Sequence, residues 1–333
     1  MRLLVIGNSC LSNEESNGRV TRTLLSAFSN EDLSCFALRG IPDIEGVDYC
    51  TVTDGDAAKA FMTLGLRKPK GIQPSASVNS PSNGRDSRKA RDHVLRDVVW
   101  FSPFWKVGKV NKWLKGLDIG AVFLMAADAP FLYRLARKVA KRKKVPLIIY
   151  SSEDYFLKRY NYVERKVAMN LWCRLFLNRL RKEAKKAFRQ ASMSMLCSKK
   201  LLRSVKDAFG DIPAEVVYQP SLVKPYPKRN GPISKVVYGG NVNADRLHAL
   251  FDVANCIHAY NDSLVLDVYG DASEEVKAAM EAAPLHPLPR QGPLPGTTEG
   301  IRDHRHARPR RGLQRIQAAR LRARLLHQDR GLL

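Results

Sequence analysis

No apolar run in the sequence approaches the length of a membrane span, so we expect no transmembrane helix. The apolar stretch at residues 2–7 is too short for a signal peptide and is interrupted at Asn8. The six cysteines form no Cys-x-x-Cys pair and have no histidine at metal-ligand spacing, which indicates buried thiols in a reducing compartment. These absences predict a cytoplasmic protein that could still associate with the inner face of the cell membrane.

Acidic residues are scarce relative to basic ones. The 333-residue chain has 56 Lys and Arg against 32 Asp and Glu, a net charge of +24. Residues 285–333 contribute 11 Arg against three acidic residues, which leaves 45 basic and 29 acidic residues, or +16, in the first 284. This charge predicts attraction to phosphate-bearing ligands, an anionic membrane surface or nucleic acid. No RRM, KH or zinc-finger pattern is present, so we expect no nucleic-acid partner.

Short apolar runs alternate with helical patterns, which is typical of βαβ units and a parallel sheet. The strand patterns lie at residues 3–6, 35–38, 49–52, 121–125, 145–150, 192–197 and 215–218, and the helical patterns at 19–28, 129–144 and 163–190. Residues 68–91 are mostly polar, Pro, Gly and basic, which predicts a mobile loop. We therefore expect an α/β fold with a complete Rossmann-like domain over residues 1–225.

A second α/β unit begins after a proline-rich, linker-like stretch at residues 219–231. Its patterns are a strand at 236–238, a helix at 244–260 and a strand at 264–269. The composition changes after Pro284, so we expect residues 226–284 to be only the start of a second, incomplete Rossmann-like domain.

Three segments carry a resemblance to a known family: Val-Pro-Leu-Ile-Ile-Tyr-Ser-Ser-Glu-Asp-Tyr-Phe (145–156), Val-Val-Tyr-Gly-Gly-Asn (236–241) and Leu-Asp-Val-Tyr-Gly (266–270). In their order and spacing the chain resembles GT-B glycosyltransferases, particularly the glycosyltransferase family 4-like enzymes of bacterial surface polysaccharide synthesis. The resemblance covers residues 1–284. It implies two Rossmann-like domains facing a cleft, the first holding the acceptor and the second the nucleotide-sugar, and transfer without a metal or other cofactor.

The resemblance places substrate-binding residues in the loop after the first strand. Family members bring a polar, Gly-containing loop beside the reacting sugar, so Asn17 and Gly18 are expected to bind substrate. Gly18 ahead of a helix N-terminus would let backbone N–H groups approach an anionic ligand. The alternative is an ordinary Asn-Gly turn without a binding role.

Glu153 and Asp154 lie just beyond the carboxyl end of a strand, where open α/β folds bind their ligands. The family commonly has a His-Asp pair here, so the resemblance implies catalytic roles for both residues, with Glu153 standing in place of the histidine. A carboxylate could orient a hydroxyl or stabilise positive charge on an oxocarbenium-like sugar. Alternatively, the two residues cap the next helix.

The nucleotide-sugar site is expected in the second domain. The resemblance implies that Gly239, Gly240 and Asn241 form the turn that approaches the diphosphate, and that Arg246 neutralises the leaving group. Asn241 replaces a residue that is often Arg in the family.

Residues 285–333 contain no Lys, Val, Ser, Asn, Met, Cys or aromatic residue, although all of these occur upstream. Read one base later, the segment can encode Ile-Arg-Tyr-His-Gly-Lys-Val-Pro-Phe and, near its end, His-Gly-Phe-Ser-Thr-Lys-Ile-Ala-Asp. Both strings resemble segments of GT-B enzymes. We therefore expect a frameshifted, disordered Arg-rich tail that truncates the second domain; the alternative is a natural basic tail.

Two segments suggest membrane contact. Residues 100–113 mix aromatic residues with lysines, and the helical pattern at 163–190 is strongly basic. Both could lie on an anionic bilayer, although aromatic residues at helical spacing could equally belong to the core.

Two classes of function remain open. The first is a hexosyltransferase-like enzyme that moves a sugar from a nucleotide-sugar to a saccharide or lipid-linked acceptor, impaired by the altered tail. The second is a basic, non-enzymatic protein that binds membranes or nucleic acid. A damaged gene product without activity is a third possibility.

Overall fold

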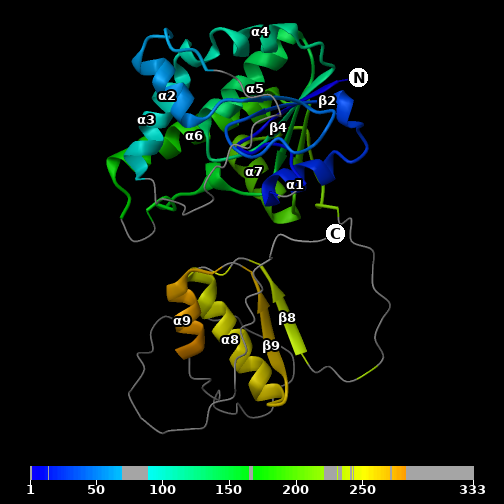
Figure 1. The fold of residues 1–333 in the computed structure, drawn as a ribbon, viewed down its shortest axis with the longest axis vertical. Helices are drawn as coiled ribbons and strands as arrows, with labels where there is room; N and C mark the ends of the chain where they lie inside the picture. The colour runs from blue at the N-terminus through cyan, green and yellow to red at the C-terminus, as the bar shows by residue number, and fades with distance from the viewer. Residues whose placement is uncertain are drawn as a thin grey trace. The chain divides into compact units, whose positions relative to one another are not determined.

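The computed structural model describes residues 2–13, 15–69, 89–164, 168–220, 231, 235–240, 242, 244–270 and 272–282. The chain divides into two compact units, Met1–Pro225 and Tyr226–Leu333 (Figure 1). Each unit has a hydrophobic core of its own. The Arg-rich segment at 285–333 lies outside the described residues, as does most of the expected loop at 68–91.

A seven-stranded sheet forms the centre of the first unit. Its strands are β1 (Leu3–Ile6), β2 (Leu33–Ala37), β3 (Asp48–Thr51), β4 (Ala121–Met125), β5 (Leu147–Ser151), β6 (Met193–Leu196) and β7 (Ala214–Val216). The order across the sheet is β3-β2-β1-β4-β5-β6-β7, and every neighbouring pair is parallel. Strands β1, β2 and β4 are almost wholly buried, because a parallel sheet is covered on both faces. The expected α/β, Rossmann-like fold is confirmed.

Seven α-helices of the first unit are described: α1 (Ser16–Leu24), α2 (Asp54–Met62), α3 (Ala90–Phe101), α4 (Lys109–Gly116), α5 (Pro130–Lys143), α6 (Leu171–Gln190) and α7 (Lys199–Phe209). Short 3-10 turns lie at η1 (Asn30–Asp32), η2 (Phe104–Lys106) and η3 (Tyr155–Leu157). Side chains mark several helix starts. Thr53 and Asp56 form a capping box at α2, Asn170 caps α6 and Ser198 caps α7.

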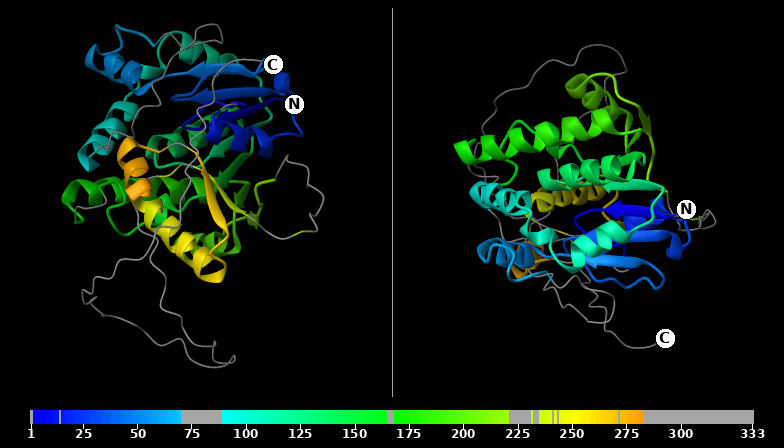
Figure 2. Two further views of the ribbon diagram at one scale, coloured as in Figure 1. Left: turned by 60° about the horizontal axis from the view of Figure 1, so that its bottom comes forward. Right: turned by 90° about the horizontal axis from the view of Figure 1, so that it is seen from above.

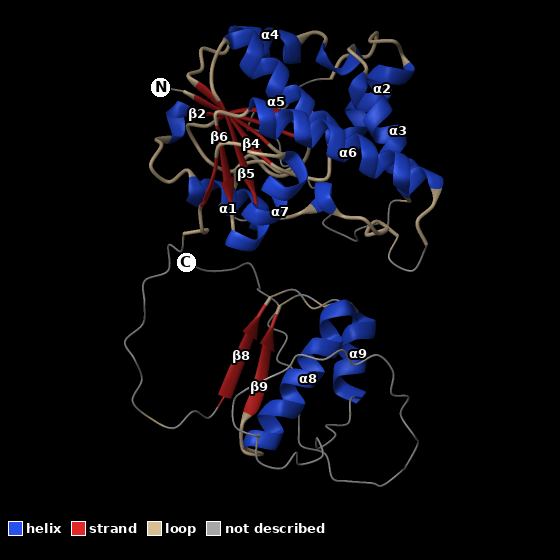
Figure 3. Cartoon of the chain, turned by 180° about the vertical axis from the view of Figure 1, so that it is seen from behind, coloured by secondary structure: helices blue, strands red, loops and turns tan. Residues whose placement is uncertain are grey.

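The helices divide unevenly between the two faces of the sheet (Figures 2 and 3). The larger core lies between one face and side chains from α2 to α7, whereas the core on the other face includes residues around α1. Aromatic rings fill the larger core. Trp100 stacks on Phe131 with ring centroids 4.5 Å apart, and Trp105 packs edge-on against Trp100 at 4.8 Å.

Trp100 and Trp105 are each only 1% exposed. The interpretation of these two residues as membrane contacts is therefore wrong, and the alternative of core packing is confirmed for them. Each indole is also held by a hydrogen bond, from Trp100 Nε1 to Asp54 Oδ1 and from Trp105 Nε1 to the carbonyl of Trp100. A buried indole N–H needs such a partner, which fixes both rings in the core.

Helix α6 begins at Leu171, later than the expected residue 163. The side chain of Asn170 accepts a hydrogen bond from the backbone N–H of Cys173, so the helix starts at this cap. Upstream, the amide oxygen of Asn161 accepts the N–H of Glu164 in a local turn. This Asx-type bond competes with helix formation.

All six cysteines are free thiols. Cys10, Cys35, Cys50 and Cys173 are buried, as expected, whereas Cys256 is exposed. Cys10 Sγ lies 3.4 Å from Thr51 Oγ1 in the core beside β1 and β3.

The second unit contains two parallel strands, β8 (Lys235–Gly239) and β9 (Val265–Tyr269), and two helices, α8 (Ala244–Tyr260) and α9 (Glu274–Ala282), among its described residues. Apolar side chains from α8, α9 and both strands form its core, with Leu250, Leu266 and Met280 among the buried members. The described part is thus one βαβ unit followed by a helix.

In the part of the chain that the structure describes, no helix combines the length and the apolar character needed to cross a membrane.

Candidate functional site

The direction of winding reverses between β1 and β4. The chain leaves β1 through α1 toward β2, and leaves β4 through α5 toward β5 on the other side. In open α/β sheets a ligand crevice forms at such a point, outside the carboxyl ends of the strands. A ligand site is therefore expected among the loops that leave the carboxyl ends of β1, β4 and β5.

The loop after β1 is held in one shape by the loop after β2. The Ser12 hydroxyl donates to Asp43 at 2.8 Å, and the backbone N–H of Asn13 donates to the same carboxylate. The N–H of Cys10 donates to the carbonyl of Arg39 at 2.9 Å. These bonds fix the path of the chain into α1.

Gly18 lies inside α1 and is buried. A Cβ atom at this position would overlap the carbonyl oxygen of Cys10 and would lie 2.8 Å from Cβ of Ser12. Glycine therefore lets the helix pack directly against the loop after β1. The Asn-Gly pair belongs to the helix and not to a turn, and Asn17 is the exposed member of the pair.

Glu153 and Asp154 follow β5 at the carboxyl edge, as expected from the sequence. Glu153 is exposed. Within the described residues its carboxylate accepts no hydrogen bond and forms no salt bridge. Asp154 makes a salt bridge of 2.7 Å with Lys158, and this carboxylate raises the pKa of the lysine. Asp154 precedes η3 without a side-chain capping bond, so its carboxylate does not serve as a cap.

A third carboxylate at this edge was missed in the sequence. Asp128 follows β4 and lies among the tyrosines of the adjoining segments. Burial, and then the charge of Asp128, raise the pKa of Tyr133 and of Tyr162 above the ordinary value. The Tyr133 hydroxyl donates to the carbonyl of Ala127 at 2.9 Å, and the rings of Tyr155 and Tyr162 lie 5.6 Å apart. The rule that identified Glu153, a polar residue after a buried strand, could have found Asp128 as well.

Three buried polar atoms at the same edge have no hydrogen-bond partner among the described residues: Asn8 Oδ1 after β1, the Tyr150 hydroxyl near the end of β5, and the Tyr162 hydroxyl beyond it. Buried polar groups are normally paired, so such atoms call for a specific explanation. A water molecule or a polar ligand that reached these atoms would supply the missing partners, as it would for the other unpaired buried atoms of the described residues, such as Ser34 Oγ and Ser194 Oγ. Carboxylates, an amide and tyrosine hydroxyls are groups that hydrogen-bond the hydroxyls of a sugar.

The second unit carries the other expected residues. Gly239 ends β8 and Gly240 follows it, with a φ of +153°, a conformation that favours glycine. The N–H of Gly240 donates to the carbonyl of Tyr269 at 2.8 Å. Arg246 is exposed on the first turns of α8, and its guanidinium donates to the Tyr238 hydroxyl at 3.3 Å. Asn241 lies outside the described residues.

The expected residues thus form two groups. Asn17, Gly18, Glu153 and Asp154 belong to segments that leave the carboxyl edge of the first sheet, and Gly239, Gly240 and Arg246 lie at the carboxyl end of β8 in the second unit. Within the described residues, no group of three or more His, Cys, Asp or Glu side chains is arranged to hold a metal ion.

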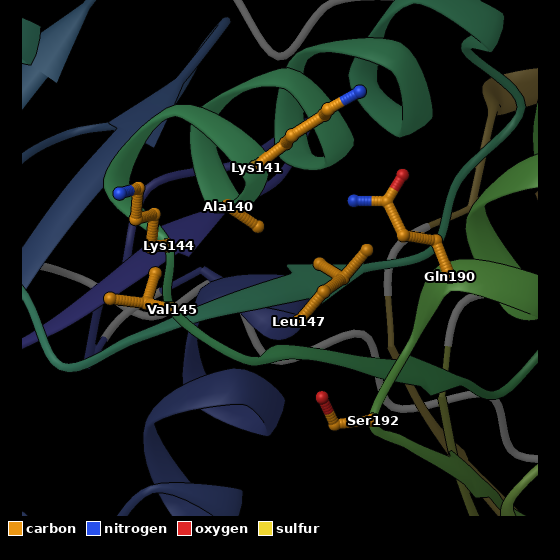
Figure 4. Close-up of a pocket in the computed structure, with 7 residues that line it drawn as sticks. All are labelled: Ala140, Lys141, Lys144, Val145, Leu147, Gln190 and Ser192. Carbon is orange, nitrogen blue, oxygen red and sulfur yellow. The ribbon is translucent and has the colours of Figure 1, made fainter.

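A surface depression of about 400 Å³ lies away from this edge (Figure 4). Its lining comes from the end of α5, the start of β5 and the segment joining α6 to β6: Ala140, Lys141, Lys144, Val145, Leu147, Gln190 and Ser192. These residues lie at the amino ends of the strands. The depression is therefore separate from the candidate site.

No protein-family model and no curated protein matches the chain. Similar solved structures include an α,α-trehalose-phosphate synthase (UDP-forming) from Burkholderia xenovorans in complex with glucose-6-phosphate. It is 11% identical, the match covers 83% of this chain and 69% of that chain, and the TM-score is 0.45.

Two plant structures are also similar. A UGT transferase from Siraitia grosvenorii in complex with UDP is 12% identical, with 82% of this chain and 63% of that chain covered and a TM-score of 0.38. Phytolacca americana UGT2 complexed with UDP-2-fluoro-glucose and pterostilbene is 10% identical, with 84% and 73% covered and a TM-score of 0.38. Because these scores are low, the fold assignment rests on the parallel sheet itself.

Proposed function

We propose that the chain is a glycosyltransferase of the GT-B type that moves a sugar from a nucleotide-sugar to a saccharide or lipid-linked acceptor. The observation that carries the proposal is the carboxyl edge of the first sheet. There Asp128 and Glu153 accompany buried polar atoms of Asn8, Tyr150 and Tyr162 that lack partners among the described residues. Such an edge suits a ligand rich in hydroxyl groups.

In this proposal the first unit holds the acceptor and the second the donor. The exposed carboxylate of Glu153 stabilises positive charge that develops on the transferred sugar. Asp154, the next residue along the chain, orients a substrate hydroxyl. Asn17 contacts substrate at the start of α1, while Gly18 shapes that site by letting the helix approach the loop after β1.

The donor site would lie at the end of β8. The backbone of Gly239, Gly240 and Asn241 approaches the diphosphate, and Arg246 neutralises the charge on the leaving group. We place the enzyme among the family 4-like transferases of bacterial surface polysaccharide synthesis. It would work in the cytoplasm, with peripheral contact to the anionic inner face of the membrane.

We also propose that the tail impairs the enzyme. The composition of residues 285–333 differs from that of the first 284, as a shifted reading frame would produce, and in that case the second domain would lack the strands that complete a nucleotide site. The domain arrangement then becomes residues 1–225, a second-domain fragment over 226–284, and the Arg-rich tail.

Sugar transfer by a chain with the reading frame restored after Pro284 tests the catalytic assignment. Glu153→Gln should lower the transfer rate by about 100-fold while leaving nucleotide-sugar binding unchanged, because the carboxylate acts on the transition state. Asp211→Asn, on an exposed carboxylate before β7, is the matched control and should transfer normally. Normal transfer by Glu153→Gln would exclude the proposed role of Glu153.

A further inference from the structure

Lys106, the last residue of η2, has a half-buried side chain. Its Nζ lies 4.9 Å from the centroid of the Trp105 ring, which is itself buried in the core. Among the described residues the amine forms no salt bridge and donates no hydrogen bond. Burying a charge without a counter-charge is costly, and the face of an indole ring compensates only part of that cost.

The charges around this amine are positive as well. Arg134, Lys138 and Arg142 recur at every fourth residue of α5 and therefore lie along one side of that helix; we call them the α5 stripe. Burial, and then the charges of the stripe, lower the pKa of Lys106. Lys138 and Arg142 are exposed, and neither forms a salt bridge within the described residues.

Core contacts hold η2 beside α5. The carbonyl oxygen of Trp100 accepts Trp105 Nε1 at 2.9 Å and Arg134 Nη2 at 3.5 Å, so it joins the residue before Lys106 to the first residue of the stripe. The Trp100 ring also stacks on Phe131 of α5. The backbone at Lys106 is therefore fixed near the stripe by buried aromatic residues.

The elements around the amine bring no carboxylate to it. The sequences of η2, α4 and α5 contain neither Asp nor Glu. Asp97 and Glu183 act on Arg134, but each already forms a salt bridge with an arginine of another helix, at 2.6 Å and 3.1 Å. The described residues thus leave Lys106 and the exposed part of the stripe without a neutralising partner.

We propose that Lys106 and the α5 stripe bind a phosphate group of a small, soluble ligand. A phosphate monoester carries about two negative charges at neutral pH, and its oxygens accept hydrogen bonds from ammonium and guanidinium groups together. Arg142 supplies a planar fork of donors that matches this geometry. The bound anion would place a counter-charge among cations that otherwise repel one another.

The proposed anion site is separate from the candidate sugar site. Helix α5 runs from the carboxyl end of β4 to the amino end of β5, and Lys138 and Arg142 lie in its second half. The ligand would therefore lie away from the carboxyl edge of the sheet. The site needs neither sugar nor nucleotide, so it is independent of the function proposed above.

A lipid headgroup or a nucleic acid would also present phosphate groups. Nucleic acid that binds without sequence preference normally stacks its bases on exposed aromatic rings, whereas the ring at this site, Trp105, is 1% exposed. Phospholipid offers the same phosphate chemistry, so the experiment includes vesicles as a separate source.

Calorimetric titration of the full chain with inorganic pyrophosphate at neutral pH tests the proposal. Wild type should bind one pyrophosphate, and less tightly as salt rises. Lys106→Gln and Arg142→Gln should each weaken binding about tenfold, because each removes a charged donor. Lys199→Gln removes the same charge from an exposed position on α7 and is the matched control, so it should bind within about twofold of wild type.

The titration of Lys106 distinguishes a specific site from general attraction to a basic protein. In NMR spectra of chain labelled with ¹³C-lysine, with the resonance assigned by Lys106→Gln, its pKa should lie near 8 without pyrophosphate and rise toward 10.5 at saturation. Equal loss of binding in Lys199→Gln, unchanged binding by Lys106→Gln, or a Lys106 pKa that pyrophosphate does not move would overturn the proposal. A pKa that moves only with phosphatidylglycerol vesicles or with an oligonucleotide would also overturn it.

Discussion

The carbonyl oxygen of Cys10 faces Gly18 so closely that no side chain fits between the loop after β1 and helix α1. The loop cannot move away easily, because Ser12 and Asn13 are hydrogen-bonded to Asp43. At the scale of the residue, the candidate site thus depends on an absent side chain as much as on the carboxylates present. The backbone at Gly18 sets the position of Asn17.

Gly18→Ala should lower the free energy of unfolding by about 3 kcal/mol, because the new methyl group overlaps a loop that is held in place. Urea denaturation followed by circular dichroism measures this. Gly116→Ala is the control. A Cβ at Gly116, the last residue of α4, would meet nothing within 4 Å, so this change should stabilise the protein by about 0.5 kcal/mol. Equal stability of the two variants would show that α1 does not pack as described.

Lys106 lies against the Trp105 ring, with its Nζ 4.9 Å from the ring centroid. Burial, and then the charges of Lys138, Arg134 and Arg142, lower the pKa of Lys106 from 10.5 to about 8. Between these two values the unfolded chain binds more protons than the folded chain, so this group makes stability rise with pH across that window.

Lys106→Met should therefore be more stable than wild type at neutral pH and should lose the rise in stability between about 8 and 10.5. Denaturation midpoints at a series of pH values give the comparison. Lys109→Met, at an exposed position of α4, should keep the wild-type profile. A Lys106→Met profile parallel to that of wild type would mean that burial does not lower the pKa of the Lys106 amine.

At the scale of the element, the sequence predicted uninterrupted patterns best, whether strand or helix. The expected strand at 121–125 coincides with β4, and the expected helix at 244–260 coincides with α8. Both are uninterrupted patterns, and a buried strand of a parallel sheet is apolar along its whole length. Boundaries set by a side-chain cap were less predictable, as at Asn170, where the cap overrides a basic helical pattern that runs further upstream.

Helices α2, α3 and α4 were not predicted. Trp100, Trp105 and Trp113 are interleaved with lysines in the sequence, and only the tertiary contacts show that Trp100 and Trp105 face the core. The position of Glu153 and Asp154 after β5 could be predicted from the strand rule. The surroundings of Asp128 could not, because Tyr155 and Tyr162 belong to a different loop.

Asp54 joins α2 to α3, since its Oδ1 accepts both Arg96 Nε and Trp100 Nε1 at 2.8 Å. Asp54→Ala should lower the free energy of unfolding by about 2 kcal/mol, because the buried Trp100 indole loses its acceptor. Asp207→Ala, at an exposed position of α7, should change it by less than about 0.5 kcal/mol. Thermal denaturation distinguishes the two variants. Equal midpoints would show that the hydrogen bonds to Asp54 do not stabilise the fold.

At the scale of the whole molecule, charge and composition divide the chain. The basic helices of the first unit and the break after Pro284 are both visible in the sequence, but only the structure shows which apolar residues of these helices are exposed. The tail lies outside the described residues, so its disorder and the truncation of the second domain stay predictions. Both bear directly on activity.

Calorimetric titration with nucleotide-sugars tests the central claim most directly, using the 333-residue chain beside a chain with the frame restored by one base after Pro284. The restored chain should bind one nucleotide-sugar at a single site, because its second domain regains the strands that hold a diphosphate. The 333-residue chain should give no binding heat. Tight binding by the 333-residue chain, or no binding of any nucleotide-sugar by the restored chain, would contradict the account.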